Sequence, residues 1–135
     1  QLGQTKNAQR RADVTTILNA VYQYSIDNNG AIPPSISTTT RNICKTGVSS
    51  TVCQGVAAGF GGVDLGGGRV INDAVYLGEL TTSELYLTSI PTDPSGVGTA
   101  TTGYYIRKTP TNRIYVEAPH AESFDSNTVY INVTR

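Results

Sequence analysis

The spacing of apolar residues near the start of the chain predicts an amphipathic helix. At about 100° per residue the apolar side chains fall within about 80° of one direction, while polar side chains collect on the opposite face. The apolar stripe consists of Val14, Ile17, Leu18 and Val21. Asn29 and Gly30 then supply a left-handed stop before a pair of prolines that cannot continue the helix. We therefore expect a helix over residues 1–29. Its first twelve residues have little apolar surface to give to a globular head.

A period of two replaces the helical period towards the end of the chain. Between residues 103 and 117, apolar and polar side chains alternate on both sides of Thr109-Pro110-Thr111, which is typical of a β-hairpin. Residues 129–133 repeat the alternation and predict another strand. Ile114, Val116 and Ile131 are expected on the buried face, and the helix stripe is the obvious element to cover it.

Tyrosine is the abundant aromatic residue, with eight tyrosines against two phenylalanines and no tryptophan. Tyr105, Tyr115 and Tyr130 fall on the strand face opposite the expected core. A row of exposed tyrosines would suit a neighbouring subunit or a ligand, because tyrosine supplies contact area at little entropic cost. Ordinary cross-strand pairing on a solvated sheet explains the row equally well.

These patterns predict an α+β fold in which a long N-terminal helix packs on a C-terminal antiparallel sheet of three to four strands. The 135 residues fit one domain. Residues 30–70 contain prolines, the cysteines and a glycine-dense tract, and we expect a long irregular connection there. Residues 71–135 are expected to form the sheet region.

Charge and composition narrow the functional classes. Ten basic and ten acidic residues cancel, so no overall field draws the chain to nucleic acid, and we expect no nucleic-acid partner. Charged residues make up only 15% of the chain, which suits an exported protein. Cys44 and Cys53 offer too few ligands for zinc, and in an oxidising compartment they predict a local disulfide.

An enzymatic site finds little support in the sequence. His120 is the single histidine, and no G-x-S-x-G motif accompanies it, so we interpret it as a surface or turn residue. The glycine tract lacks G-K-[ST] and is interpreted as a surface loop. Lys6, Arg10 and Arg11 form a basic cluster at the helix start, where contact with a membrane surface or with a neighbouring subunit is expected. We expect no enzyme activity and no cofactor.

Three blocks of sequence resemble one known family. Residues 7–33, NAQRRADVTTILNAVYQYSIDNNGAIP, contain a charged, alanine-bearing helix that leads through a tyrosine pair into a D-N-G-x-x-P-like turn. YLTSIPTDPSG (86–96) contains an L-x-x-I-P-x-D-P turn, and GYYIRK (103–108) with RIYVEAPHAE (113–122) follows as strands. Together the blocks resemble type IV pilins and the pseudopilins of type II secretion.

The resemblance implies a structural subunit of an extracellular filament on the cell surface. Identical or related subunits would be its partners, and its N-terminal helix would drive assembly from a membrane-anchored precursor. The family's apolar segment of about twenty residues is absent, which we interpret as truncation to a soluble head. Cys44 and Cys53 also lie between helix and sheet, unlike the common position near the family's C-terminus.

Two alternative functions within the same family remain open. The chain could be a pseudopilin of a short periplasmic filament, or a minor pilin or adhesin whose head binds a surface ligand. Major pseudopilins often bind calcium beside the sheet. That property makes Asp64, Asp73 and Asp93 weak calcium candidates, although they lack a regular acidic spacing.

Overall fold

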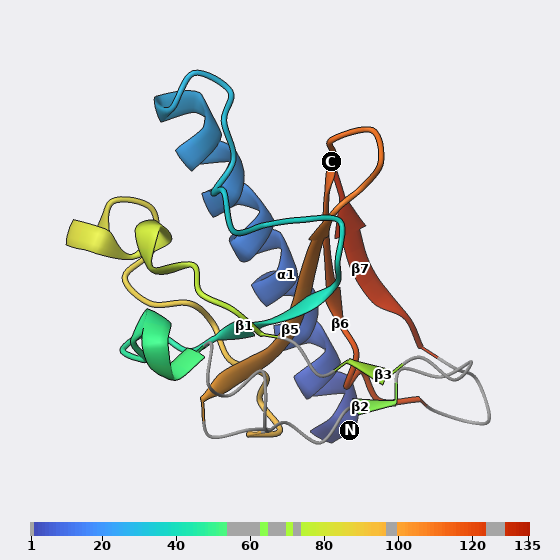
Figure 1. Ribbon diagram of the computed structural model, residues 1–135. Helices are drawn as coiled ribbons and strands as arrows, with labels where there is room; N and C mark the ends of the chain where they lie inside the picture. The colour runs from blue at the N-terminus through green and yellow to red at the C-terminus, as the bar shows by residue number, and fades with distance from the viewer. Residues whose placement is uncertain (1, 54–62, 65–69, 72–73, 97–99, 124–128) are drawn as a thin grey trace.

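The computed structural model shows a long N-terminal helix, α1 (Leu2–Asp27), packed along a β-sheet (Figure 1). It describes residues 2–53, 63–64, 70–71, 74–96, 100–123 and 129–135. The strands are β1 (Arg41–Cys44), β2 (Val63–Asp64), β3 (Val70–Ile71), β4 (Ala74–Val75), β5 (Thr101–Lys108), β6 (Ile114–Ala118) and β7 (Ile131–Thr134). Two short 3-10 helices, η1 (Gly78–Leu80) and η2 (Thr82–Glu84), lie between β4 and β5. The fold is therefore α+β, as the sequence predicted.

The helix stops where its punctuating residues predict. Asn29 and Gly30 take φ values of 58° and 87°, the left-handed conformation that glycine and asparagine adopt most readily. The Gly30 amide donates to the Ser25 carbonyl at 2.8 Å and so satisfies one of the last helical acceptors. The loop after α1 can then turn back towards the sheet.

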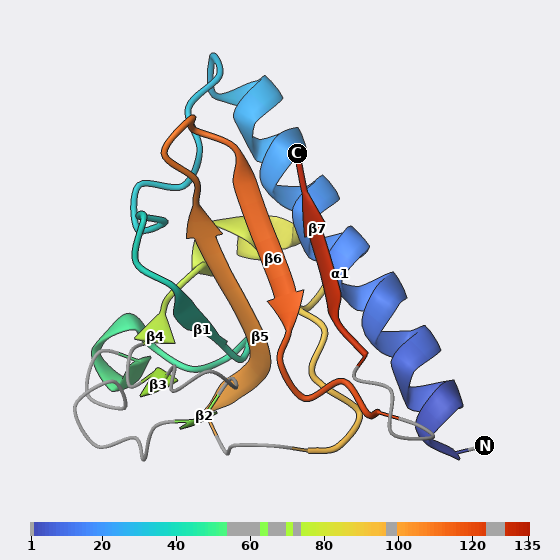
Figure 2. The same ribbon diagram turned by 90° about the vertical axis from the view of Figure 1, so that its right-hand side faces the viewer.

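The predicted hairpin and C-terminal strand form the antiparallel part of the main sheet. Ile106 pairs with Val116, and Val116 pairs with Val133, so β5, β6 and β7 run as a meander. The turn between β5 and β6 is closed by the Thr109 amide, which donates to the Arg113 carbonyl at 2.7 Å. Figure 2 shows these strands side by side with α1 running along them.

The main sheet is mixed and larger than expected, because two strands come from outside the predicted ones. The strand order is β4-β1-β5-β6-β7, with β1 antiparallel to β5 and parallel to β4. Strand β1 lies inside the region 30–70, so the expectation of an irregular connection there is wrong in part. Three consecutive residues of β1 are buried, which leaves no alternation to detect.

The pairing of β1 with β5 contains a β-bulge. The register shifts between Asn42 and Cys44, and Gly103 opposite them has a φ of 84°, which a residue with a Cβ rarely adopts. The Gly103 amide donates to Asn42 Oδ1 at 3.1 Å, so the buried amide side chain substitutes for a missing ladder bond. A buried polar residue in a four-residue strand is a weak sequence signal.

Helix and sheet bury one continuous apolar core. All of the residues assigned to it above are buried and belong to the same cluster: Val14, Ile17, Leu18, Val21, Ile114, Val116 and Ile131. Ile36, Ile43, Leu77 and Leu80 add side chains from the connecting segments. The core sits between α1 and the face of β6 and β7 and extends to η1.

The predicted disulfide is confirmed. Cys44 at the end of β1 is bonded to Cys53, with 6.1 Å between the two Cα atoms. Cys53 ends the described part of a helical turn over residues 50–53, where the Cys53 amide donates to the Ser49 carbonyl at 2.9 Å. The crosslink ties this turn to the central part of the sheet.

Candidate functional site

The N-terminal half of α1 is held to the head by buried polar side chains. Arg10 is fully buried, and its guanidinium donates to both carboxylate oxygens of Asp93, at 2.9 Å and 3.1 Å. The same guanidinium donates to Asn7 Oδ1 at 2.9 Å and to Ser95 Oγ at 2.6 Å. We call Asn7, Arg10, Asp13, Asp93 and Tyr104 the polar cluster.

The rest of the polar cluster links α1 to the sheet. Tyr104, on β5, donates its hydroxyl proton to Asp13 Oδ2 at 2.5 Å. Asn7 exchanges two bonds with the backbone of Glu122, donating to its carbonyl at 2.8 Å and accepting from its amide at 3.0 Å. The Asp93 amide donates to the Thr102 carbonyl at 2.7 Å. The helix is thus fixed to β5, to the loop at Asp93 and to the segment after β6.

Burial and pairing shift the pKa values in this cluster. Burial alone would raise the pKa of Asp93, but the bonds from Arg10 and the Ser95 amide outweigh it and lower that pKa. Burial and the bond to Asp13 raise the pKa of the Tyr104 hydroxyl. Burial lowers the pKa of the neighbouring His120. The charge of Asp93 acts to raise this pKa and the charge of Arg10 to lower it, and the pKa remains below its usual value. Arg10 and Asp93 are therefore a charged pair at neutral pH.

The polar cluster corrects two expectations and adds to a third. Arg10 was expected to contact a neighbouring subunit, yet it has no exposed surface, because Asp93 neutralises it inside the head. Asp93 is unsuited to hold calcium, because a guanidinium occupies both of its oxygens. Residues 1–12 were expected to give little apolar surface to the head, and the side chains they bury in it, Asn7 and Arg10, are polar.

A signal for this cluster was present in the helix periodicity. At about 100° per residue, Asn7 and Arg10 fall within about 40° of Val14, so the buried stripe continues towards the N-terminus with polar residues. A search restricted to apolar residues ends that stripe too early. Asn7 was missed as a cluster member for this reason, whereas Asp13 and Tyr104 were missed because their hydrogen bond joins positions 91 apart in the sequence.

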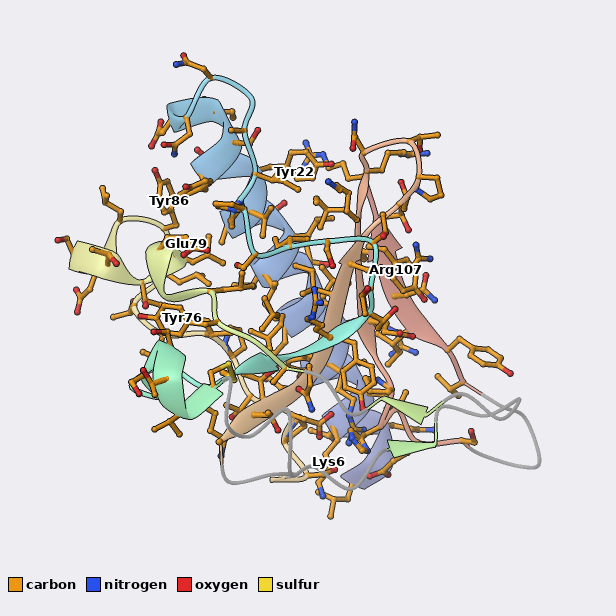
Figure 3. All side chains as sticks on the ribbon, viewed as in Figure 1. Lys6, Tyr22, Tyr76, Glu79, Tyr86 and Arg107 are labelled. Atoms are coloured by element: carbon orange, nitrogen blue, oxygen red, sulfur yellow. A yellow bond between two sulfur atoms is a disulfide. The ribbon has the colours of Figure 1, made fainter. Side chains whose placement is uncertain are left out.

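The remaining predicted contact residues lie at different places on the surface. Arg11 is exposed on α1, Lys6 is partly buried, and Tyr130 is 79% exposed beside β7. Tyr115 is partly buried, with the Arg107 guanidinium 4.5 Å from its ring centroid. Figure 3 shows Lys6 at the N-terminal end of α1 and Arg107 on β5, well apart. The four side chains do not form one site, although Tyr130 shares a cleft with Tyr115 and a groove with Arg11.

Tyr105 corrects the expected tyrosine row. It was placed on an exposed face, but it is completely buried, so the sheet face opposite α1 is covered at β5. The same face is open further along the sheet, where Glu117 is partly buried and Asn132 is exposed. Only Tyr115 and Tyr130 of the three tyrosines are therefore available for contact.

No protein-family model, curated protein or solved structure matches this chain. Within the described ranges, no helix is both long enough and apolar enough to cross a membrane. The same ranges contain no group of three or more histidine, cysteine, aspartate or glutamate side chains placed to hold a metal. Asp64 lies in β2, and Asp73 lies outside the described residues.

Glu79 lies in η1, which packs against α1, and tests how a buried carboxylate affects stability. Among the described residues, its Oε1 atom has no hydrogen-bond partner and no exposed surface, and burial raises its pKa (Figure 3). The unfolded chain then loses this proton at a lower pH than the folded chain, so stability falls as pH rises through the raised pKa. Glu79→Gln should remove that cost and raise the melting temperature at neutral pH by a few degrees.

Thermal melts at two pH values check this expectation. The gain from Glu79→Gln should be present at about pH 7 and vanish below about pH 4, where the carboxyl is protonated in both states. Glu84→Gln, which changes an exposed carboxylate nearby, is the matched control and should leave the melt unchanged. An equal gain at both pH values would contradict the proposed cause.

Proposed function

We propose that this chain is a structural subunit of a type IV pilus-like extracellular filament, which assembles by packing α1 against the helices of neighbouring copies. The observation that supports this is the outward face of α1. Most of its exposed side chains are uncharged, among them Leu2, Thr5, Ala8, Gln9, Ala12, Thr16, Asn19, Gln23 and Ile26, and the exposed charges of α1 are Arg11 and, at its last position, Asp27.

An outer face with so few charges is unusual for a helix that only meets water. The solvent face of an amphipathic helix normally carries charged residues, which keep it hydrated. Here Ala8, Ala12 and Thr16 follow one another at spacings of four, so small side chains form a row along the helix. Small residues allow two helices to approach closely. This face is suited to pack against another helix.

The resemblance to pilins and the polar cluster support the same proposal. The three resembling blocks correspond to α1, to the loop carrying Asp93, and to the β5–β6 hairpin, which are the parts that hold helix and head together. Because Arg10 and Asn7 fix α1 to two separate segments of the head, packing of α1 in a filament would also fix the orientation of the head.

Ala12→Arg should prevent assembly without unfolding the head. A long cation on the outward face of α1 would hold neighbouring helices apart, while an exposed substitution changes stability by less than about 0.5 kcal/mol. Cells that carry the full gene with this substitution should lack the filaments seen with the unaltered gene by electron microscopy. Circular dichroism of the purified variant checks that it folds.

Thr111→Arg is the matched control, because it adds the same side chain to the exposed β5–β6 turn. Filaments should persist in this variant. The subunit is identified by mass spectrometry of purified filaments. Filaments that do not contain this chain, or that form normally with Ala12→Arg, would overturn the proposal.

A ligand-binding head, as in a minor pilin, is the second candidate. A cleft of about 210 Å³ on the open sheet face is lined by Tyr115, Glu117, Ser123, Tyr130 and Asn132, among other residues. Tyrosine rings beside carboxylate, hydroxyl and amide groups are suited to a polar ligand with apolar faces, such as a sugar. Absence of this chain from filaments would favour this function.

A further inference from the structure

The loop that carries Leu85 is built to present one apolar side chain to solvent. Leu85 is 68% exposed, although the loop around it is tightly closed by the Leu87 amide, which donates to the Leu80 carbonyl at 3.0 Å. Leu80 itself is fully buried. We call residues 81–87 the Leu85 loop. Its base is anchored in the core while its tip extends outward.

The backbone of this loop is strained at two consecutive positions. Ser83 and Glu84 both have a φ of 54°, in the left-handed region that residues other than glycine seldom occupy. Such strain persists only where the surrounding structure imposes it, and it is common at binding surfaces. The strain therefore holds Leu85 in a fixed exposed position, which reduces the entropy lost on binding.

A groove with apolar and polar walls lies elsewhere on the molecule, between α1 and β7. Its volume is about 300 Å³, and it is lined by Arg11, Val14, Thr15, Tyr130, Ile131, Asn132 and Val133. Val14, Ile131 and Val133 supply apolar walls, and the exposed Arg11 is the charged side chain among the lining residues. We call this the α1–β7 groove.

The charges beside the two features are complementary. Glu84 precedes Leu85 in the loop and is exposed, whereas Arg11 borders the groove. The Leu85 loop follows η1, which packs against α1, whereas the groove lies beside β7, the edge strand at the opposite end of the sheet from β4 (Figures 1 and 2). A contact between two unlike surfaces leaves a free loop at one end and a free groove at the other, so it can repeat without closing.

We propose that Leu85 of one copy inserts into the α1–β7 groove of the next copy, with Glu84 pairing with Arg11 across the contact. This inference deepens the proposed filament function, because it specifies a contact between heads that adds to the packing of helices. The occupant of the groove is a second copy of this chain, since the same chain supplies both the acidic loop and the basic groove.

Nuclear magnetic resonance of the 135-residue chain tests the contact in solution. When the concentration is raised to about 1 mM, the amide resonances of the Leu85 loop and of the groove should shift together, and the dependence of these shifts on concentration gives the dissociation constant of a weak association. Leu85→Asp should weaken this association at least tenfold. Val52→Asp, which changes another exposed apolar residue, should leave it unchanged.

A charge exchange separates pairing from a general effect of each substitution. Glu84→Arg and Arg11→Glu should each weaken the association by about fivefold, and the double variant should return it to within about twofold of the original. The proposal would be overturned by a chain that stays monomeric, or by an association that Leu85→Asp does not weaken. It would also be overturned if the double variant associated more weakly than both single variants. Binding of Leu85 to a different protein in place of a second copy would also overturn it.

These outcomes differ from a failure of the filament proposal. If filaments contain this chain but its heads do not associate through Leu85, the head contact is wrong and the helix packing stands. If heads associate as described but no filament contains the chain, the filament proposal fails and the contact stands.

Discussion

Replacing Arg10 with alanine is expected to lower the free energy of unfolding by about 3–5 kcal/mol. The substitution leaves the carboxylate of Asp93 buried without its cation, and removes the donors to Asn7 and Ser95. Urea unfolding followed by circular dichroism measures the loss. Arg11→Ala is the matched control: it removes an exposed arginine from the next helix position and should cost less than about 0.5 kcal/mol.

A double variant shows whether the cost comes from the unpaired charge. Arg10→Met with Asp93→Leu removes both charges, and should recover most of the stability that Arg10→Met alone loses, because buried ion pairs contribute little net stability over apolar side chains. A double variant as unstable as the two single variants added together would show that the residues do not act as a pair.

The Arg10–Asp93 pair also predicts the direction of the acid response. The pKa of Asp93 is lower in the folded chain than its ordinary value of 3.8. The unfolded chain therefore takes up this proton first as pH falls, and the stabilisation present above that ordinary value is lost as pH falls through the lowered one. The difference in stability between the unaltered chain and Arg10→Met should shrink over that acidic range.

Removing the disulfide is expected to cost about 2–3 kcal/mol, as the chain-entropy estimate gives for a short loop closed by a crosslink. Cys44 and Cys53 are nine positions apart, and both are buried. The Cys44→Ala, Cys53→Ala double variant should unfold at a lower urea concentration than the oxidised chain. Adding a reductant should lower the midpoint of the unaltered chain and leave the double variant unaffected.

Alkylation tests the crosslink separately from stability. An alkylating reagent applied to the native chain without reductant should label neither cysteine, and both should be labelled after reduction. Labelling of Cys44 and Cys53 in the unreduced chain would contradict the crosslink. An unchanged urea midpoint in the double variant would instead show that the bond forms but does not stabilise the fold.

The elements that could be predicted have signals close together in the sequence. The helix was found from a repeating apolar stripe and from its stop at Asn29 and Gly30, and the β5–β6 hairpin from alternation on both sides of one turn. The disulfide was found because its two cysteines are separated by few residues. Each of these features needs only neighbouring residues to be specified.

The candidate site was predicted less well than the fold. Arg10 was singled out, but as a surface cation, and Asp93 only as a weak calcium candidate, because neither has its partner nearby in the sequence. Their separation of 83 positions means that only the folded chain brings them together. Once the connection places Asp93 beside α1, a buried guanidinium with a buried carboxylate costs far less than either alone.

The sequence by itself thus determined the helix, the C-terminal antiparallel strands, the disulfide and the outline of an α+β fold, since these depend on local period and spacing. The tertiary structure decided the rest. It placed β1 and β4 in a mixed sheet and buried Tyr105. It also attached the N-terminal half of α1 to the head through buried polar side chains. Those outcomes depend on which distant segments meet, and burial of charge is acceptable only where the opposite charge arrives.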